Sequence, residues 1–368
     1  MNYKRNGFNF FIIIFILKIN KFNSKLSFKY PTSNTLANGN IFVIEENGIF
    51  VCDPDLTTII KEVKIFPENE KISTLDKLST VILIRRNDFI ISLINYKVYF
   101  FKPDGTFLYN SEKLIQNYNP TSVSLTPITI SANNVIDYVV SYFDAQIHLN
   151  LSYYMYDMKN NISKYYSTTK MNQCKYINGE YYDFKNQGLS CLYFADYYFN
   201  YYYSSHDHWY IVCFFVTIEN EFEYLEEMAF YINDNNQFSL SGRYTNDYIK
   251  FNNNIITSIH SNRCGNLDRA LVCVSTSNNN STCYKFVLKD KKAQFYNSIN
   301  FNEKCSSESY GIKVNYISET KNIFFSCLLS DGFGGVLSQM FGLNLETYNS
   351  KHKFLSGFRY IWFFCYIF

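Results

Sequence analysis

Short runs of aliphatic and aromatic residues alternate with turn residues along most of the chain. The pattern is clearest from Ser79 to Leu114, where four such runs are separated by Arg-Asn-Asp, Asn-Tyr-Lys and Pro-Asp-Gly. Each run has the length and the β-branched or aromatic composition of a strand. Asp104-Gly105, between the last two runs, is a strong hairpin signal because the mirror-image turns need positive φ. Four antiparallel strands in about 35 residues are typical of one blade of a β-propeller.

Similar units can be traced on both sides of this stretch. We therefore predict an all-β fold, β-propeller-like, with about six four-stranded blades. The propeller-like domain is placed at residues 25–350, with 171–187 as an inter-blade loop. Polar residues 25–40 are an entry segment, and one alternative is that it donates a strand, Leu26–Tyr30, which closes the ring against the last blade. The run Glu223–Glu227 is also compatible with a helix. No repeat carries the marks of a named propeller family, and a β-sandwich pair is the alternative.

The N-terminus has the features of a secretory signal. Lys4 and Arg5 precede Phe8–Leu17, an apolar run of ten residues, which is shorter than the about 20 residues that a membrane-spanning helix needs. We predict a signal peptide at residues 1–24 and a protein that is secreted or lies on the extracellular face of a membrane. The apolar tail at residues 351–368 has no assigned role, and membrane attachment through it is one interpretation.

Cysteines support an oxidising compartment. The chain has ten of them and no C-x-x-C motif. The predicted disulfides are Cys191–Cys213, Cys273–Cys283 and Cys305–Cys327. The first and third pairs share a separation of 22 residues, and the second pair flanks a polar stretch that a symmetric hairpin would fold so that the two cysteines lie opposite each other.

Glycosylation sequons agree with secretion. Asn150, Asn161, Asn279 and Asn280 each begin an N-x-[ST] match, so we predict a glycoprotein. Chance matches are expected in so Asn-rich a chain, and the sequons add little alone.

Composition excludes one class of partner. Lys plus Arg number 34 against 32 Asp plus Glu, a net charge of +2. A nucleic-acid binder needs a dominant basic face, so no nucleic-acid partner is expected. Aromatic residues make up 19% of the chain, but they also suit strands and do not by themselves indicate a site.

One segment concentrates catalytic residue types. His206, Asp207 and His208 would suit a metal or a general base, but no third ligand is spaced nearby, and a polar loop is the more ordinary interpretation. The glutamates of Glu223–Glu227, together with Asp207, would be the carboxylates of a glycosidase. Signatures of metalloproteases, serine hydrolases, dinucleotide enzymes and kinases are missing. We expect no cofactor, no metal and no catalytic residue.

Two functions remain from different classes. The first is a secreted or cell-surface binding module whose loops recognise a protein or glycan partner, since loops on a rigid scaffold commonly carry recognition. The alternative is a carboxylate-dependent, glycosidase-like hydrolase on the same scaffold. A hydrolase would gather carboxylates at the centre of the disc. A binding module would instead spread polar and aromatic side chains over a rim.

Overall fold

The computed structural model describes the chain from residue 31 to residue 355, with gaps. The described ranges are 31–37, 40–45, 48–52, 58–63, 79–82, 89–94, 96–111, 114, 122–130, 135–171, 174–175, 181–195, 209–219, 222–233, 235–244, 249–251, 255–263, 269–277, 281–289, 292–301, 312–317, 322–330, 336–344 and 353–355.

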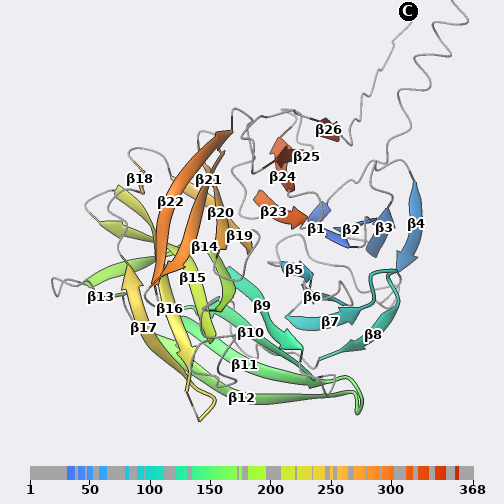
Figure 1. The fold of residues 1–368 in the computed structure, drawn as a ribbon, viewed down its shortest axis with the longest axis horizontal. Coiled ribbons are helices and arrows are strands. Elements are labelled where there is room, and N and C mark those ends of the chain that lie inside the picture. The colour runs from blue at the N-terminus through green and yellow to red at the C-terminus, as the bar shows by residue number, and fades with distance from the viewer. Residues whose placement is uncertain are drawn as a thin grey trace, which may run out of the picture.

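Six antiparallel sheets make up the described fold (Figure 1). We number them as blades 1 to 6. Blades 1 to 3 consist of β1 (Pro31–Ala37), β2 (Asn40–Glu45), β3 (Gly48–Cys52) and β4 (Ile59–Val63); β5 (Ser79–Ile82), β6 (Ile90–Ile94), β7 (Lys97–Phe101) and β8 (Phe107–Asn110); and β9 (Ser122–Ile130), β10 (Val135–Phe143), β11 (Leu149–Asp157) and β12 (Ile162–Met171). Blades 4 to 6 consist of β13 (Cys174–Lys175), β14 (Tyr181–Ala195), β15 (Trp209–Glu219), β16 (Phe222–Ile232), β17 (Phe238–Tyr244) and β18 (Lys250–Phe251); β19 (Ile256–Arg263), β20 (Arg269–Thr276), β21 (Ser281–Lys289) and β22 (Lys292–Phe301); and β23 (Ile312–Ile317), β24 (Asn322–Ser330), β25 (Val336–Asn344) and β26 (Lys353–Leu355).

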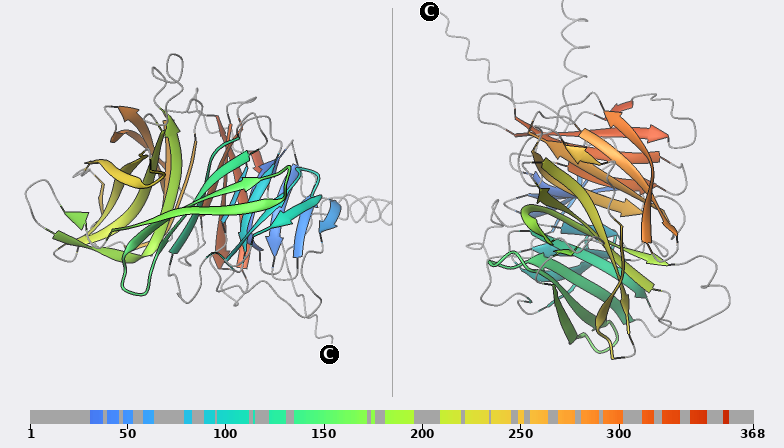
Figure 2. Two further views of the ribbon diagram at one scale, coloured as in Figure 1. Left: turned by 90° about the horizontal axis from the view of Figure 1, so that it is seen from below. Right: turned by 90° about the vertical axis from the view of Figure 1, so that its left-hand side faces the viewer.

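The six blades form a closed ring. The innermost strands contact one another in the order β1, β5, β9, β14, β19 and β23, and β23 returns to contact β1. The two views of Figure 2 show the sheets side by side, each twisted relative to the next. The predicted β-propeller of about six blades is therefore confirmed, with four strands in each blade except blade 4, which has the additional short strands β13 and β18. The β-sandwich pair is not the fold. Among the residues that the structure describes, no helix has the length and apolar character needed to cross a membrane.

The hydrophobic core is divided into clusters that lie between neighbouring blades. Most strands therefore have buried side chains on both faces. In β10, Val139 and Phe143 pack in the cluster shared with blade 4, whereas Tyr138 and Val140 pack in the cluster shared with blade 2. Side chains alternate between the two faces of a strand, so both sets are apolar. This arrangement explains why the sequence shows near-continuous apolar runs rather than strict alternation of apolar and polar residues.

The predicted hairpin at Asp104-Gly105 is present between β7 and β8. Gly105 has a φ of +79°, and the Asp104 carboxylate accepts hydrogen bonds from the Thr106 backbone N–H and hydroxyl at 2.8 and 2.9 Å. A Cβ at residue 105 would lie 2.8 Å from side-chain atoms of both Val51 and Val63. Glycine is therefore required by the backbone conformation and by the close approach of this turn to blade 1.

One predicted boundary was wrong, and two open alternatives are resolved. β14 begins at Tyr181, inside the predicted inter-blade loop, and the entry segment does donate a strand that closes the ring against blade 6, namely β1 at Pro31–Ala37. Both stretches are polar, yet backbone hydrogen bonding to an apolar neighbour makes them strands, because a ladder does not depend on side-chain polarity. The run Glu223–Glu227 lies within strand β16.

Candidate functional site

The cluster His206, Asp207 and His208 lies outside the described residues. Its flanking strands are described: Ala195 at the end of β14 pairs with Trp209 at the start of β15. The cluster thus belongs to the connection between the first two long strands of blade 4. Among the described residues, no group of three or more His, Cys, Asp or Glu side chains could hold a metal ion.

The glutamates of β16 do not form a carboxylate pair. Glu226 is fully buried, and its Oε1 accepts a hydrogen bond from the Thr217 hydroxyl at 2.9 Å. Glu223 is also buried, and its Oε2 accepts a hydrogen bond from the backbone N–H of Ile256 in blade 5 at 2.6 Å.

Alternation along β16 separates these acids further. Leu225 packs in the cluster shared with blade 5, and Met228 packs in the cluster shared with blade 3. Glu223 and Glu227 therefore lie on the blade 5 side of β16, and Glu226 lies on the opposite side. Four residues of strand, about 13 Å, separate Glu223 from Glu227, beyond the roughly 5–9.5 Å of glycosidase pairs. In addition, β16 is not an innermost strand, so these acids do not gather at the centre of the ring.

Two of the three predicted disulfides are confirmed. Cys191 pairs with Cys213 across β14 and β15, and Cys273 pairs with Cys283 across β20 and β21, each in direct register. Their Cα–Cα distances are 4.0 and 3.9 Å, which is shorter than the about 4.4–6.8 Å usual for bridged cysteines. Cys305 lies outside the described residues, and nothing is described of the Cys327 side chain, so this pair stays a prediction.

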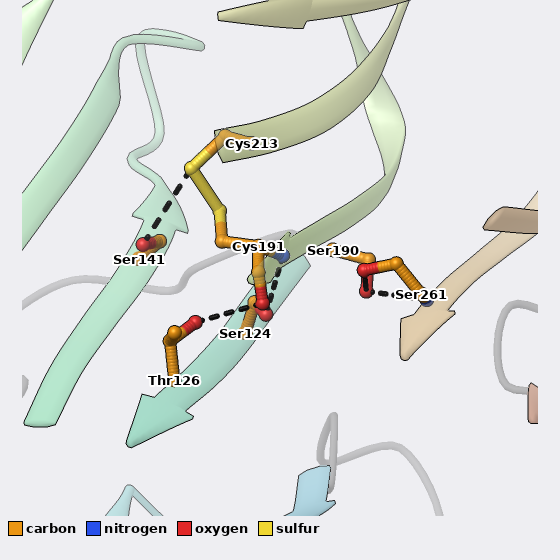
Figure 3. Close-up of a disulfide and its surroundings, with 7 residues drawn as sticks. All are labelled: Ser124, Thr126, Ser141, Ser190, Cys191, Cys213 and Ser261. Carbon is orange, nitrogen blue, oxygen red and sulfur yellow. Dashed lines mark hydrogen bonds between the residues drawn. A yellow bond between two sulfur atoms is a disulfide. The ribbon is translucent and has the colours of Figure 1, made fainter. Parts of the chain in front are cut away.

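Hydroxyl groups beside the first disulfide join three blades (Figure 3). Ser124 of β9 accepts a hydrogen bond at Oγ from the Cys191 N–H at 2.9 Å, and Thr126 donates to the Cys191 carbonyl at 2.8 Å. On the next blade, Ser190 Oγ accepts a hydrogen bond from the Ser261 N–H at 2.9 Å. These contacts show that side-chain hydroxyls bond to the backbone between neighbouring innermost strands. Hydroxyl residues at every second position, Ser122, Ser124 and Thr126, are the sequence pattern from which these contacts could have been predicted.

The two described sequons have opposite environments. Asn150 is buried, and its Nδ2 donates to the His148 carbonyl at 2.9 Å and to Asp144 at 3.3 Å. Asn161 is exposed in the turn before β12, and its Oδ1 accepts a hydrogen bond from the Tyr156 hydroxyl at 2.8 Å. Asn279 and Asn280 lie outside the described residues.

Asp144 is a buried acid that the sequence did not distinguish from an ordinary turn residue. Its carboxylate accepts hydrogen bonds from the His148 backbone N–H at 2.9 Å and lies 3.1 Å from the Lys170 ammonium. Burial by itself would raise its pKa, but the hydrogen bonds from the His148 N–H, from Lys170 and from Asn150 outweigh burial and hold the pKa at about 2. The carboxylate therefore ties the β10–β11 turn to the outermost strand β12.

Seven of the nine large exposed apolar side chains of the described residues lie on the outermost strands of the blades, and the other two are Ile218 on β15 and Ile255 before β19. On β4, β8, β12, β17 and β22 the seven are Ile59, Ile60, Phe107, Ile162, Tyr165, Leu240 and Tyr296. These strands form the outer rim of the ring (Figure 1).

β12 carries two of these exposed side chains. Ile162 is 56% exposed and Tyr165 is 54% exposed. The Tyr165 ring lies 5.5 Å from the ring of Tyr154, and its hydroxyl donates to Thr168 at 3.0 Å. The ring is thus held by its neighbours while half of it faces solvent.

The two halves of β12 differ in their contacts with the neighbouring blade 4. In the second half, Ser167 donates a hydrogen bond to the Asn236 carbonyl of blade 4, and Thr169 both donates to the Phe238 carbonyl and accepts from its N–H. In the first half, residues 162–166, Ser163 contacts Tyr138 and Tyr165 contacts Tyr154, both within blade 3. Tyr166 contacts Tyr153 and packs against the cluster shared with blade 4. β12 is also the last strand of its sheet, with β11 as its paired neighbour. The first half of β12 is therefore an exposed sheet edge.

Comparison with known proteins supports the fold. No family model matches the chain, and no curated protein matches it. Among solved structures, a mutant of the Aleuria aurantia lectin in complex with alpha-methyl-L-fucoside has a TM-score of 0.50 at 10% identity, over 87% of this chain and 95% of that chain. The Vanderwaltozyma polyspora Nup133 β-propeller domain has a TM-score of 0.46 at 11% identity, over 80% and 78%. The WD40 domain of SCAP from fission yeast has a TM-score of 0.40 at 8% identity, over 90% and 86%. At 10% identity, the similarity to the lectin concerns the fold alone.

Proposed function

We propose that this protein is a secreted or cell-surface binding module that recognises a protein or a glycan. The observation that carries the proposal is the presence of large exposed side chains on the outermost strands, while the candidate glutamates of β16 are buried. Exposed tyrosines combine a large apolar ring with a hydroxyl, and they are enriched where proteins contact their partners. The exposed first half of β12, centred on Tyr165, is the proposed contact surface.

Two features support an extracellular location, and a third supports one of the two partner classes. Two disulfides between buried cysteines are typical of proteins that fold in an oxidising compartment. The basic and apolar N-terminal residues have the pattern of a signal peptide over residues 1–24. One structural neighbour is a lectin in complex with a fucoside, which agrees with a glycan as one of the two partner classes. The predicted tail at residues 351–368 contains β26 of blade 6 at Lys353–Leu355, so only the residues after this strand are proposed as a membrane attachment.

The proposal is tested by a binding screen with matched surface variants. The purified full chain is applied to a glycan microarray and to an array of extracellular proteins, and each hit is measured again with Tyr165→Ser and with Tyr296→Ser. Tyr296, on β22, is also exposed but lies on a different blade. We expect at least tenfold weaker binding for the Tyr165 variant and unchanged binding for the Tyr296 variant. A partner that binds both variants as tightly as wild type would place recognition away from β12, and a chain with no partner in either array would contradict the binding function.

A further inference from the structure

The turn between β11 and β12 holds Asn161 in a fixed and accessible position. Asp157 Oδ1 accepts hydrogen bonds from the backbone N–H groups of Lys159 and Asn160, and these bonds order the turn. Asn161 has a φ of +58°, a conformation that asparagine adopts more readily than most residues. The side chain is exposed, and its Oδ1 is held by the Tyr156 hydroxyl. An N-linked glycan is attached to Nδ2. Because the hydrogen bond at Oδ1 fixes the side-chain amide, Nδ2 is held in one orientation at the protein surface.

Asn150 offers the opposite geometry. Its Nδ2 donates two hydrogen bonds inside the protein, to His148 and Asp144, and the side chain is buried. A glycan attached to this atom before folding would remove the donor from Asp144 and His148 and force a bulky polar group into a buried site. Of the two described sequons, only Asn161 is compatible with a glycan in the folded protein.

The position of Asn161 gives such a glycan a role. It immediately precedes the exposed first half of β12, where Ile162 and Tyr165 are more than half exposed. An exposed sheet edge with apolar side chains is a template for pairing with another chain, and proteins cover or charge such edges. Lys164 is the one charged residue among residues 162–166.

We propose that Asn161, and not Asn150, carries an N-linked glycan, and that this glycan keeps the backbone edge of the first half of β12 from pairing with a second copy of the chain, while the Tyr165 ring on the face of the strand stays open to the proposed partner. The inference rests on the proposed secretory location. In the transfer step, Asn161 Nδ2 forms a bond to C1 of an oligosaccharide while the C1–O bond to its lipid-pyrophosphate carrier breaks, and one amide proton leaves. The lipid-pyrophosphate oligosaccharide is the co-reactant, and no oxidation or reduction takes place.

Glycan occupancy tests the site. The full chain is expressed in a eukaryotic secretory host, once with its own N-terminus and once behind an added signal peptide, and the sequons are mapped by mass spectrometry after enzymatic deglycosylation in heavy-oxygen water. With the added signal, we expect label on Asn161 and none on Asn150. An unlabelled Asn161, or a labelled Asn150 in folded secreted protein, would overturn the assignment. If glycan is missing only from the form with its own N-terminus, the proposed location fails while the assignment of Asn161 is supported.

Self-association tests the shielding role. Ser163→Ala removes the sequon, whereas Ser163→Thr keeps it, and the two variants are compared with wild type by sedimentation velocity. We expect the alanine variant, and wild type deglycosylated after folding, to self-associate at least tenfold more tightly than the glycosylated forms. Adding Ile162→Lys to the alanine variant should restore the monomer. Deglycosylated protein that stays as monomeric as wild type would refute the shielding role.

Discussion

Ser124 on β9 accepts a hydrogen bond at its Oγ from the backbone N–H of Cys191 on β14, over 2.9 Å. These two residues belong to different sheets, and the bond crosses the inner end of the interface between blades 3 and 4. The innermost strands of neighbouring blades belong to separate hydrogen-bonded sheets. The buried N–H of Cys191 therefore needs an acceptor outside the backbone ladder, and the Ser124 hydroxyl provides it. The same arrangement recurs between Ser190 and Ser261 on the next pair of blades.

Replacing Ser124 by alanine should therefore destabilise the protein by about 1–3 kcal/mol, because the buried N–H of Cys191 loses its acceptor. Ser298→Ala on β22 is the matched control, since Ser298 is exposed and such substitutions usually change stability by less than about 0.5 kcal/mol. Urea unfolding of the two variants checks the prediction. Equal midpoints for the two would show that the hydroxyl is not needed.

Removal of either described disulfide should lower the free energy of unfolding, and the two losses should be similar to each other. The bridges span 22 and 10 residues, and in the chain-entropy model each contributes about 3 kcal/mol, slightly more for the longer loop. The paired variants Cys191→Ala with Cys213→Ala, and Cys273→Ala with Cys283→Ala, are compared with wild type in denaturant without reductant. Non-reducing peptide mapping of wild type provides the control and also tests the predicted Cys305–Cys327 bridge. Peptides that join these cysteines in other combinations would contradict the pairing.

Asp144→Asn should destabilise the protein near neutral pH and much less in acid. The folded-state pKa of Asp144, about 2, lies below the value of about 3.9 for an unfolded chain. Its ionised form therefore adds about 2 kcal/mol of stability above pH 4, and this contribution is lost as the pH falls toward 2. Unfolding at pH 7 and at pH 3 measures the difference between wild type and variant.

Asp157→Asn is the control for this experiment. The pKa of Asp157 is lowered by its hydrogen bonds to Asn160, but the residue lies in an exposed turn, so its replacement should cost less. A loss for the Asp144 variant that does not depend on pH would argue against the assigned role of its charge.

Alkaline pH should weaken the packing between blades 2 and 3. Burial raises the pKa of both Tyr154 and Tyr156 to about 12. Because the folded pKa lies above that of the unfolded chain, about 10, these tyrosines contribute stability that is present below pH 10 and lost between pH 10 and 12. We expect a loss on the order of 1 kcal/mol per tyrosine between pH 9 and pH 11, measured by urea unfolding at both values.

Tyr156→Phe removes one of these ionising groups and should reduce the pH dependence. Tyr165→Phe is the matched control, since Tyr165 is half exposed. A pH dependence that is unchanged in the Tyr156 variant would show that its hydroxyl does not titrate with unfolding.

Much of the fold follows from local patterns in the sequence. In the unit Ser79–Leu114, all four predicted strands and the Asp104-Gly105 turn are present, because strand composition and turn chemistry act over a few residues. The Cys273–Cys283 register follows in the same way, since a symmetric hairpin leaves the two cysteines opposite each other. Val272 and Val274 accordingly pack in the cluster shared with blade 4, on the face away from the sulfurs.

Only the tertiary structure decided the environments of the polar residues. Asn150 and Asn161 have the same sequon, yet one is buried and the other is exposed, because burial depends on which blade packs against which face of a strand. Glu226 and Glu227 are adjacent in sequence and lie on opposite faces of β16, so the acidic run did not provide a carboxylate pair. The strands β1 and β14 begin in polar segments, where pairing with a neighbour rather than side-chain composition determines the backbone. The sequence by itself therefore determined the strands, the turns and the local cysteine pairs, whereas contacts between blades determined which side chains remain available to a partner.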